Sequence, residues 1–475
     1  MGANMTKIKF GTSGWRGILA DEFTFENVRV VTQAICDHIR SKGETEKGVV
    51  VGYDTRFMGR KFALESAEIL AANGIKAYLC KRDVPTPVIA FEIMRRKAAG
   101  GINFTASHNP PEYNGLKFSS SWGGPALPET TGDIEKRAND MMGEMTYWEV
   151  SYKKGVHDHL IEPIEPKAEY LKDIREKVDL SVLKGMKIAV DHLYGTSRGY
   201  LDTVLEEAGC QVVRFHEHPD PSFGGRPPEP AEENIHDLIE KVKNDSSISI
   251  GLATDGDADR FGIVDRGGRY IEPNYIIALL LDYLIRTRRW KGGVARSVAT
   301  TQLIDRVAKK HGVEVYETPV GFKYIGELIT EDKLVIGGEE SAGLTIKGHV
   351  PEKDGILACL LVAEMVAREG KSISEMLNNL YSEVGTVLTR RVNIHLEGKV
   401  GSGLKERLKT PPKSFAGLNV EKVITIDGTK LVLSDGSWVL IRPSGTEPVV
   451  RFYAEAFNEE GLDRLTEAGN TLIQG

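Results

Sequence analysis

The sequence predicts an α/β protein with three related α/β domains that have mixed sheets, followed by a C-terminal α+β domain. Its 475 residues are too many for one hydrophobic core, so three or four domains are expected. A strand–helix–strand unit with glycine at the end of the helix occurs three times, around Gly74, Gly209 and Gly312. Beyond about residue 386, short strands separated by Asp-Gly turns indicate a different kind of domain. Chance regularity among α/β sequences would also produce three such copies.

The individual elements follow from apolar periodicity. Apolar residues at helical spacing over 28–39 predict an amphipathic helix, and a second helix is expected from about 61 to 73, before Gly74. Strands of the α/β domains are expected at 49–51, 75–79, 98–104, 187–191, 210–215, 248–253, 293–295, 313–316 and 333–336. Strands of the last domain are expected at 388–395, 422–426, 430–433, 438–441 and 449–455, with a helix after them.

Domain boundaries are expected where these patterns break. The charged stretch 157–166 contains two prolines and is typical of a linker. Gly267 and Gly268 mark a second break, although a hairpin inside one domain would look the same. A third break lies near 382–386. The predicted domains are 1–157, 158–266, 267–383 and 384–475.

Composition excludes several classes of protein. A formal net charge of −7 argues against a nucleic-acid partner. Four scattered cysteines without metal spacing favour free thiols in a reducing cytosol, and the N-terminus lacks a secretory signal, so a cytoplasmic location is expected. The apolar runs 275–285 and 355–366 are too short to span a bilayer, and each contains an acidic residue. We expect them to form buried helices, with no membrane partner.

A candidate nucleophile, Ser107, follows the predicted strand 98–104. The turn signals Asn-Pro-Pro at 109–111 and Asn-Gly at 114–115 predict an ordered loop that reaches solvent. A lone serine in a loop is usually only a turn residue. Near the N-terminus, glycines surround Arg16, an arrangement in which backbone and cation approach a phosphate closely, although a simple surface loop would look alike.

A candidate metal loop, 255–260, follows the predicted strand 248–253. Its carboxylates at alternating positions, Asp255, Asp257 and Asp259, would converge on one cation if the loop curls. Such a set predicts a hard divalent ion, Mg²⁺ by chemistry. The EF-hand pattern fails, because the loop has neither glycine at its sixth position nor glutamate at its twelfth. A solvated acidic turn is the remaining alternative.

Several motifs resemble those of the α-D-phosphohexomutases, the phosphoglucomutase/phosphomannomutase family. Thr-Ala-Ser-His-Asn-Pro at 105–110, followed by Asn-Gly-x-Lys at 114–117, resembles that family's active-serine loop. The Asp-Gly-Asp-x-Asp-Arg motif at 255–260 matches the family's metal loop completely. With two later motifs in the family's order, the resemblance spans nearly the whole chain. It implies four domains around a central cleft.

The resemblance also implies roles at the reactive centre. Ser107 would carry a phosphoryl group, and an oxygen of that group would be the fourth ligand of one Mg²⁺ per subunit, beside the three aspartates. Arg260 would face the phosphoryl group, and Arg16 would reach into the cleft. Lys117 would assist proton transfer or screen charge, and His108 is a possible second contributor. Each of these residues could instead be an ordinary loop or surface residue.

Three further segments resemble substrate-binding loops of the family. The loop 337–343 implies that Glu339 and Ser341 grip two sugar hydroxyls. Its Glu-Glu-Ser sequence is phosphoglucomutase-like, and Gly343 stands where many relatives have a histidine. The resemblance implies that the following segment supplies a histidine and a lysine instead, His349 and Lys353. The loop 318–323 adds Gly321 and Lys323, although a plain strand end would look similar. The family's clamp for the non-reacting phosphate matches Arg442, Ser444, Gly445, Thr446 and Arg451.

We therefore expect a hexose-phosphate mutase that interconverts hexose 1-phosphate and hexose 6-phosphate, of glucose or mannose or both. The reaction would use a phosphoserine and a hexose 1,6-bisphosphate, which would also serve as activator. Phosphoglucosamine mutase, a non-catalytic phosphosugar-binding protein and a phosphatase with aspartate nucleophiles are the alternatives. The sequence does not choose between a monomer and a homodimer.

Overall fold

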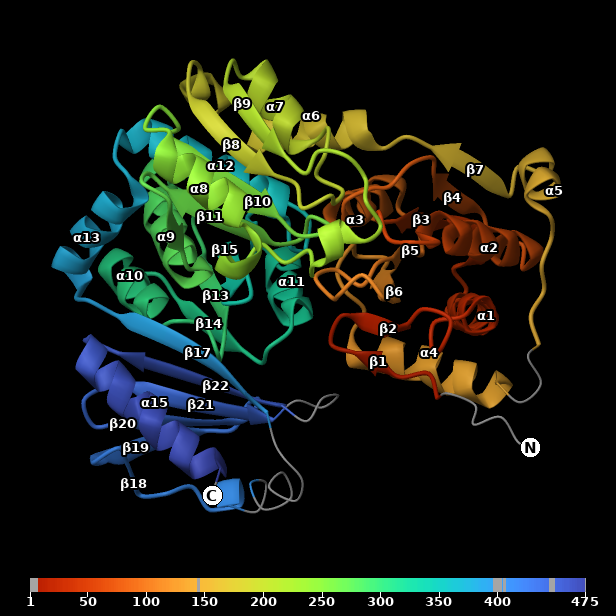
Figure 1. Cartoon of the computed structure of the whole chain (residues 1–475). Coiled ribbons are helices and arrows are strands. Elements are labelled where there is room, and N and C mark those ends of the chain that lie inside the picture. The colour runs from red at the N-terminus through yellow and green to blue at the C-terminus, as the bar shows by residue number, and fades with distance from the viewer. Residues whose placement is uncertain (1–6, 143–145, 396–403, 405–406, 444–448, 475) are drawn as a thin grey trace.

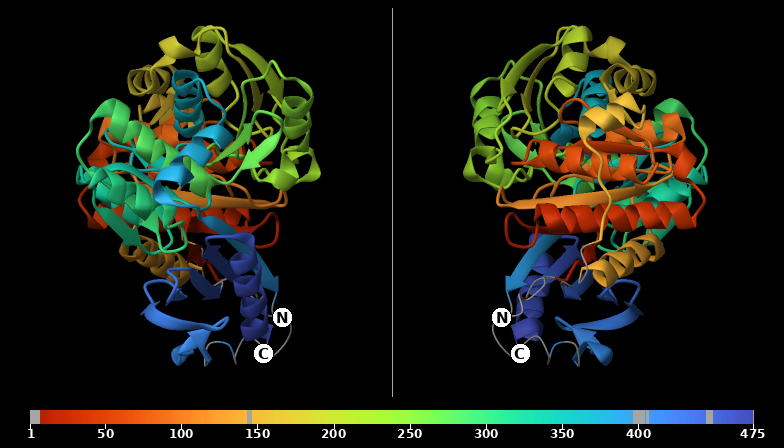
Figure 2. Two further views of the ribbon diagram at one scale, coloured as in Figure 1. Left: turned by 90° about the vertical axis from the view of Figure 1, so that its left-hand side faces the viewer. Right: turned by 90° about the vertical axis from the view of Figure 1, so that its right-hand side faces the viewer.

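The computed structural model describes residues 7–142, 146–395, 404, 407–443 and 449–474. They form four sheets with their helices, and the C-terminal sheet lies at one end of the molecule (Figures 1 and 2). The predicted class, three α/β domains with mixed sheets and an α+β domain at the C-terminus, is confirmed. In the described part of the chain, no helix is long and apolar enough to cross a membrane.

The first domain contains a mixed sheet in the order β1-β2-β6-β5-β3-β4-β7. Its strands are β1 (Phe10–Gly11), β2 (Gly14–Ile18), β3 (Val49–Tyr53), β4 (Ala77–Cys80), β5 (Gly100–Phe104), β6 (Tyr113–Ser120) and β7 (Ile161–Ile164). Its helices are α1 (Phe25–Ser41), α2 (Gly59–Ala72), α3 (Thr86–Arg96), α4 (Pro128–Met141) and α5 (Tyr152–His157). Gly74 has a φ of 72°, so the predicted end of the second helix is correct to within two residues.

Two expectations for this domain are wrong. The stretch 157–166 is not simply a linker, because β7 within it pairs in parallel with β4 and extends the first sheet. The Asn-Gly pair at 114–115 is not a turn but lies inside β6. Gly115 is needed there for close packing: a Cβ would lie 2.6 Å from the carbonyl oxygen of Thr105 and 2.8 Å from that of Trp15. The turn statistics of Asn-Gly were overridden by this contact.

The second domain has the sheet order β12-β11-β10-β8-β9. Its elements are α6 (Lys167–Lys177), β8 (Lys187–Asp191), α7 (Leu201–Glu207), β9 (Gln211–Phe215), α8 (His236–Asn244), β10 (Ile250–Thr254), β11 (Phe261–Asp265) and β12 (Arg269–Ile271). Gly267 and Gly268 join β11 to β12, which pair antiparallel. The hairpin alternative for this glycine pair is therefore the correct one.

The third domain has the sheet order β14-β13-β15-β16. Its elements are α9 (Pro273–Arg288), β13 (Gly293–Ser297), α10 (Leu303–His311), β14 (Val315–Thr318), α11 (Phe322–Thr330), β15 (Leu334–Glu339), β16 (Gly343–Ile346), α12 (Gly355–Glu369) and α13 (Ile373–Val384). As predicted, α9 and α12 contain long buried apolar runs. Helix α12 contacts β10 and β11 as well as β16, so the second and third domains share one hydrophobic core.

The C-terminal domain has an antiparallel sheet in the order β17-β22-β21-β20-β19-β18. Its elements are β17 (Leu388–His395), β18 (Ser414–Phe415), β19 (Leu418–Ile424), β20 (Thr429–Leu433), β21 (Trp438–Pro443), β22 (Val449–Ala456) and α15 (Glu459–Gln474). Helix α15 packs against β17 and β22. The opposite side of the molecule in Figure 1 is occupied by the first domain.

We expect Gly115→Ala to destabilise the protein by about 1–3 kcal/mol, because the added methyl group overlaps the backbone carbonyls of Thr105 and Trp15, which cannot move independently. Urea unfolding followed by circular dichroism would measure the change. Gly132→Ala is the matched control: this glycine lies within α4 and has open space around it, so alanine should be neutral or stabilising. Equal stability of the two variants would contradict the prediction.

Candidate active site

One buried arginine, Arg56, determines the path of the loop that carries Ser107. Its guanidinium donates hydrogen bonds to backbone carbonyls of Ser107 (2.7 Å), Asn109 (2.5 Å), Pro110 (2.8 Å) and Tyr113 (2.9 Å). Asp54 lies 3.3 Å from its Nε and balances the charge. Arg56 was not predicted as a site residue. The sequence feature that could have indicated it is its position as a charged residue soon after a buried strand.

Ser107 is buried, not solvent-reaching as predicted, and its φ of 51° is in the left-handed region. Its Oγ donates a 2.7 Å hydrogen bond to Oδ2 of Asp255 on the loop between β10 and β11. Nδ1 of His108 lies 3.4 Å from the same Oγ. The loops touch through their backbones, since a Cβ on Gly256 would lie 3.1 Å from the carbonyl oxygen of Ser107. The predicted nucleophile therefore meets the acidic loop.

The three predicted metal-ligand aspartates converge as expected. Asp255, Asp257 and Asp259 are all buried, and one carboxylate oxygen from each lies within 4.8 Å of the others. The loop curls because Oδ1 of Asp255 accepts hydrogen bonds from the backbone N–H groups of Asp259 (2.9 Å) and Arg260 (3.0 Å). Ala258 adopts a φ of 57° at the bend. The alternative of a solvated acidic turn is excluded by this burial.

Two lysines from other domains neutralise the acidic cluster. Nζ of Lys117 lies 2.6 Å from Asp257 and 2.9 Å from Asp259, and Nζ of Lys353 lies 3.2 Å from Asp259. Lys117 is on β6, not on the serine loop where it was expected. Burial by itself would lower the pKa of Lys117, but the carboxylates raise it, so it stays charged.

The donor set fits a hard divalent cation. Oδ1 of Asp257 and Oδ1 of Asp259 are buried and have no hydrogen-bond partner within the described residues. Burial and the two neighbouring carboxylates raise the pKa of Asp255 well above its ordinary value. A cation would relieve this repulsion, and carboxylate oxygens are the ligands that Mg²⁺ prefers. The residues present therefore suit the metal that the motif predicted.

Thr86 and Asn103 support the acidic loop, and neither was predicted from the sequence. The Thr86 hydroxyl, at the start of α3, donates to Oδ2 of Asp257, and its backbone N–H donates to the carbonyl of Asp257 at 2.9 Å. Nδ2 of Asn103 on β5 donates to the Thr86 hydroxyl at 2.9 Å. Hydrogen bonds of this kind orient a metal ligand. No short-range sequence signal connects these residues to a loop so far along the chain.

Two arginines lie beside the serine and the aspartates. Arg16 donates to Oδ1 of Asn109 at 2.6 Å, and Arg260 donates to Glu229 at 3.1 Å. Burial, with the charge of Arg260 nearby, lowers the pKa of Arg16 to about 10. Burial and both arginines lower the pKa of His108 well below its ordinary value, so its imidazole is neutral at pH 7. This concentration of positive charge suits a phosphoryl group.

The two predicted sugar loops are joined to each other. Glu339, at the end of β15, accepts a 2.7 Å hydrogen bond from the backbone N–H of Gly321, which precedes α11. Burial and the adjacent Glu340 raise the pKa of Glu339 to about 7. Ser341 is half-buried in the turn between β15 and β16. Lys323 lines one pocket together with Lys117, Lys353, Thr12, Ser13 and Phe322.

His349 does not have the position expected of a substrate-binding residue. Its ring is fully buried, with Nε2 2.8 Å from Asp354 and Nδ1 3.4 Å from Asp173. Asp354 also accepts from the Tyr170 hydroxyl at 2.6 Å and from the backbone N–H of Leu357, so it caps α12. The histidine is therefore committed to a buried cluster between the second and third domains. A histidine near a matching motif was mistaken for a ligand residue because its orientation is not encoded locally.

Two residues of the predicted phosphate clamp lie across from each other on the C-terminal sheet. Arg442 on β21 and Arg451 on β22 are paired in register. Nε of Arg442 donates to Asp427 at 2.9 Å, and Asp427 also accepts from the backbone N–H of Val320 in the third domain at 3.1 Å. This contact joins the predicted clamp to the predicted substrate loop 318–323. Ser444, Gly445 and Thr446 lie outside the described residues.

Comparison with protein families gives four matches along the chain. Residues 7–143, 168–268 and 272–384 match the alpha/beta/alpha domains I, II and III of phosphoglucomutase/phosphomannomutase, and 402–469 match its C-terminal domain. These matches cover most of the chain and define an intramolecular phosphotransferase. The chain belongs to the phosphoglucomutase/phosphomannomutase family, so the predicted family and enzyme class are confirmed.

Individual relatives agree with this assignment. A phosphoglucomutase/phosphomannomutase of Thermococcus kodakarensis is 33% identical, with 98% of each chain covered. A phosphoglucomutase of Komagataeibacter xylinus is 31% identical, over 95% of this chain and 88% of the relative. The solved structure of a phosphomannomutase candidate from Thermus thermophilus has a TM-score of 0.85 and 34% identity, over 99% of this chain and 100% of that one.

Thr86→Val should weaken Mg²⁺ binding about tenfold, because Asp257 loses the hydroxyl that orients it. Titration calorimetry with Mg²⁺ alone would measure this affinity. Thr203→Val is the matched control, since that helical hydroxyl donates only to the carbonyl of Gly199. Unchanged Mg²⁺ affinity in Thr86→Val would show that the hydrogen bond does not position the ligand.

The pH profile of kcat/KM should contain an ionisation near pH 7 that Glu339→Gln removes. Glu339 carries a proton below that pH, and only the ionised carboxylate accepts charge-assisted hydrogen bonds, so kcat/KM should rise as the pH rises through 7. The second ionisation of substrate phosphate lies lower and should remain. Glu327→Gln, an exposed change on α11, is the control. Retention of the pH 7 ionisation in Glu339→Gln would disprove the assignment.

Proposed function

We propose that this enzyme interconverts hexose 1-phosphate and hexose 6-phosphate, of glucose or mannose or both, with Ser107 as the phosphoryl carrier. The observation that carries the proposal is the 2.7 Å contact between Ser107 Oγ and Asp255, inside a cluster that Lys117 neutralises. A hydroxyl that faces buried carboxylates and a cation site is suited to phosphoryl transfer and has no evident structural need for such surroundings.

In the proposed reaction, phosphorylated Ser107 donates its phosphoryl group to the free hydroxyl of a hexose monophosphate. The phosphorus–oxygen bond to serine breaks, a new one to the sugar oxygen forms, and the sugar hydroxyl proton passes to the serine side. The hexose 1,6-bisphosphate then turns end for end and returns its other phosphate to Ser107. Lys117, Arg16 and Arg260 stabilise charge on the group in transit, and neutral His108 orients the serine loop.

We propose one Mg²⁺ per subunit, held by Asp255, Asp257, Asp259 and an oxygen of the phosphoserine. When bound, the ion would neutralise charge that accumulates on the phosphoryl oxygens. The protein's own contribution is to keep these groups dry and oriented. Their burial supports this, because electrostatic interactions strengthen where water is excluded.

The substrate would lie between the sugar loop and the clamp. Glu339 and Ser341 would accept and donate hydrogen bonds to ring hydroxyls, with Gly321 at the base of the same loop. Lys323 and Lys353 would meet the anionic end nearest the serine, which their shared pocket supports. The distal phosphate would be held by Arg442, Ser444, Gly445, Thr446 and Arg451. Hexose 1,6-bisphosphate would also act as activator by loading Ser107.

Two alternatives differ in their support. Phosphoglucosamine mutase activity is favoured by relatives such as a Methanosphaera stadtmanae protein named "Probable phosphoglucosamine mutase", 32% identical over 98% of both chains. A non-catalytic phosphosugar-binding protein is disfavoured, because the serine, the lysine and all three aspartates are present and in contact. Assays of glucose, mannose and glucosamine phosphates side by side would separate the mutase activities.

We also propose a cytoplasmic enzyme that acts as a monomer or homodimer. The predicted domains 1–157, 158–266, 267–383 and 384–475 are adjusted at two boundaries, so that β7 stays with the first sheet and β12 with the second. The four cysteines, Cys36, Cys80, Cys210 and Cys359, are free and buried, which supports a reducing compartment. Burial raises the pKa of each thiol, so none is a reactive thiolate.

Ser107→Ala should lower mutase activity by roughly three orders of magnitude or more, because the hydroxyl that we propose as the phosphoryl carrier is removed. A coupled assay with hexose 1-phosphate and bisphosphate activator would measure the rate, and intact mass would show the loss of the phosphate. Ser222→Ala, an exposed serine, is the control. Full activity of Ser107→Ala together with an inactive Asp255→Asn would instead support aspartate-based phosphatase chemistry.

A further inference from the structure

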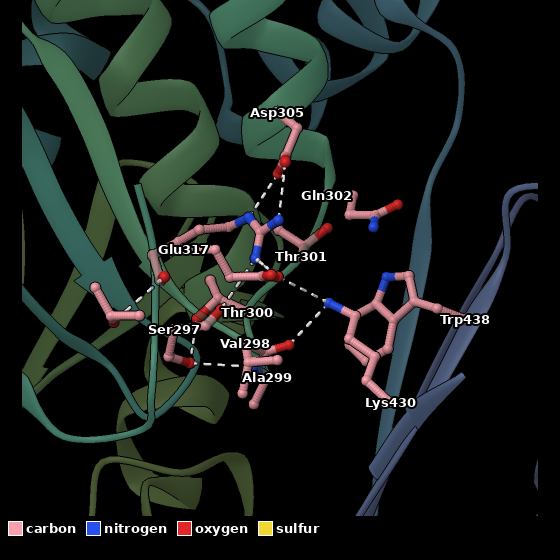
Figure 3. A network of polar contacts seen from close by, with 12 residues as sticks. Ser297, Val298, Ala299, Thr300, Thr301, Gln302, Asp305, Glu317, Lys430 and Trp438 are labelled. Carbon is pink, nitrogen blue, oxygen red and sulfur yellow. Dashed lines mark hydrogen bonds and ion pairs between the residues drawn. The ribbon is translucent and has the colours of Figure 1, made fainter. Parts of the chain in front are cut away.

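A buried lysine joins the C-terminal domain to the third domain (Figure 3). Lys430 on β20 has no exposed side-chain surface, and its Nζ lies 3.9 Å from the ring centroid of Trp438. That nitrogen donates a 2.8 Å hydrogen bond to the carbonyl of Val298, on the segment 297–302 that begins at the last residue of β13. A lysine is rarely buried without such a partner.

The same lysine contacts an ion-pair network of the third domain. Nζ lies 3.4 Å from Oε1 of Glu317 on β14, and the guanidinium of Arg296 lies 2.8 Å from that same oxygen. Arg296 also forms an ion pair with Asp305 on α10. Glu317 is therefore shared by a cation of its own domain and a cation of the C-terminal domain.

A second group of contacts binds the segment 297–302 to the C-terminal sheet. Glu455 on β22 accepts hydrogen bonds from the Thr301 hydroxyl at 2.5 Å and from the backbone N–H of Gln302 at 3.0 Å. The indole N–H of Trp438 donates to the other oxygen of Glu455 at 2.8 Å. The segment is thus attached to the C-terminal domain at both Val298 and Thr301.

The other side of the segment is attached to the sugar loop. The hydroxyls of Ser297 and Thr300 donate to Glu340 at 2.8 Å and 3.1 Å, and the Thr300 hydroxyl accepts the backbone N–H of Glu340 at 3.2 Å. Glu340 directly follows Glu339. On the far side, Lys430 pairs in register with Leu440, two residues before Arg442 on β21. The segment 297–302 therefore lies between the sugar loop and the strand that carries the clamp arginine.

We propose that Lys430 is a positioning residue for the mutase reaction, which sets the distance between the clamp on the C-terminal domain and the sugar loop by binding the segment 297–302. This inference rests on the proposed function, because only a substrate held at both ends would sense that distance. Lys430 touches neither substrate nor reacting atoms. Its substitution should change the affinity for hexose phosphate and leave the chemical step at Ser107 almost unchanged.

A charged group at this interface gives the contact a distinctive pH dependence. Burial, and then the charge of Arg296, lowers the pKa of Lys430 to about 8, while Glu317, Glu455 and Asp305 act in the opposite direction. Below pH 8 the lysine is protonated both when it is buried in the interface and when the interface is open to solvent. The buried ammonium then lowers the stability of the interface. This cost falls as the pH rises from 8 towards the ordinary lysine value, because only the buried amine then loses its proton. The interface should strengthen from pH 7 to pH 9.

Lys430→Met tests the proposal, since methionine keeps an apolar stem against Trp438 and removes the donor. KM for hexose 1-phosphate would be measured at pH 7 and pH 9 in the full-length variant and the wild type. The ratio of variant KM to wild-type KM should be roughly tenfold larger at pH 9 than at pH 7. This factor follows from a span of two pH units around a pKa of about 8. The kcat of the variant should stay within about twofold of the wild-type kcat. Lys422→Met, an exposed lysine on β19 of the same sheet, should change neither constant.

A pH-independent KM ratio, or a kcat that falls while KM stays constant, would overturn the proposal. Thermal unfolding separates this result from failure of the proposed function: the midpoint of the wild type relative to Lys430→Met should rise between pH 7 and pH 9 even without substrate. If the wild-type protein isomerised no hexose phosphate, the proposed mutase function would be refuted, and so would the role of Lys430 in that reaction. The difference in unfolding midpoint between wild type and Lys430→Met tests only the interface. A relative thermal midpoint that does not change with pH would overturn the interface assignment as well.

Discussion

The burial of three carboxylates in one short loop is the constraint on which the rest of the arrangement depends. An uncompensated buried charge costs several kcal/mol, so the loop at Asp255–Asp259 requires cations from elsewhere in the chain. Lys117 comes from the first domain and Lys353 from the third, and both reach the same Asp259 oxygen. Three domains are therefore held around one point by charge neutralisation, and the free oxygens that remain on Asp257 and Asp259 are suited to a cation.

A second buried cation fixes the serine that we propose as the reacting group. Arg56 binds four backbone carbonyls between Ser107 and Tyr113, and so gives Ser107 its left-handed backbone and directs its hydroxyl at Asp255. Such a preorganised geometry does not have to be built during the reaction, and this is the principal way in which a protein accelerates phosphoryl transfer. The C-terminal domain lies outside this centre and is attached through Lys430 and Glu455 to the segment beside the sugar loop. The proposed reactive centre and the proposed substrate clamp are thus supported by separate contacts.

Much of the fold and of the site was predictable. Helices with apolar periodicity, such as α1 and α12, and the β-branched strand β3 were located within a few residues, because their patterns are local. The serine and aspartate motifs were recognised because their spacing is also local. The errors concern residues whose surroundings are distant in sequence: Gly115 packs against carbonyls of two other segments, β7 pairs with β4, and His349 is held by Asp173.

The sequence by itself determined the family, the order of the domains and the chemical groups available: a serine, three aspartates, and the arginines and lysines that suit phosphate. This was possible because the spacing of residues within a short motif determines which side chains can come together. Only the tertiary structure decided which of these groups meet. Thr86 and Asn103 support Asp257 across two domains, and Lys117 reaches the aspartates from a strand. Such contacts depend on how separate cores pack together, and no stretch of the chain contains that information alone.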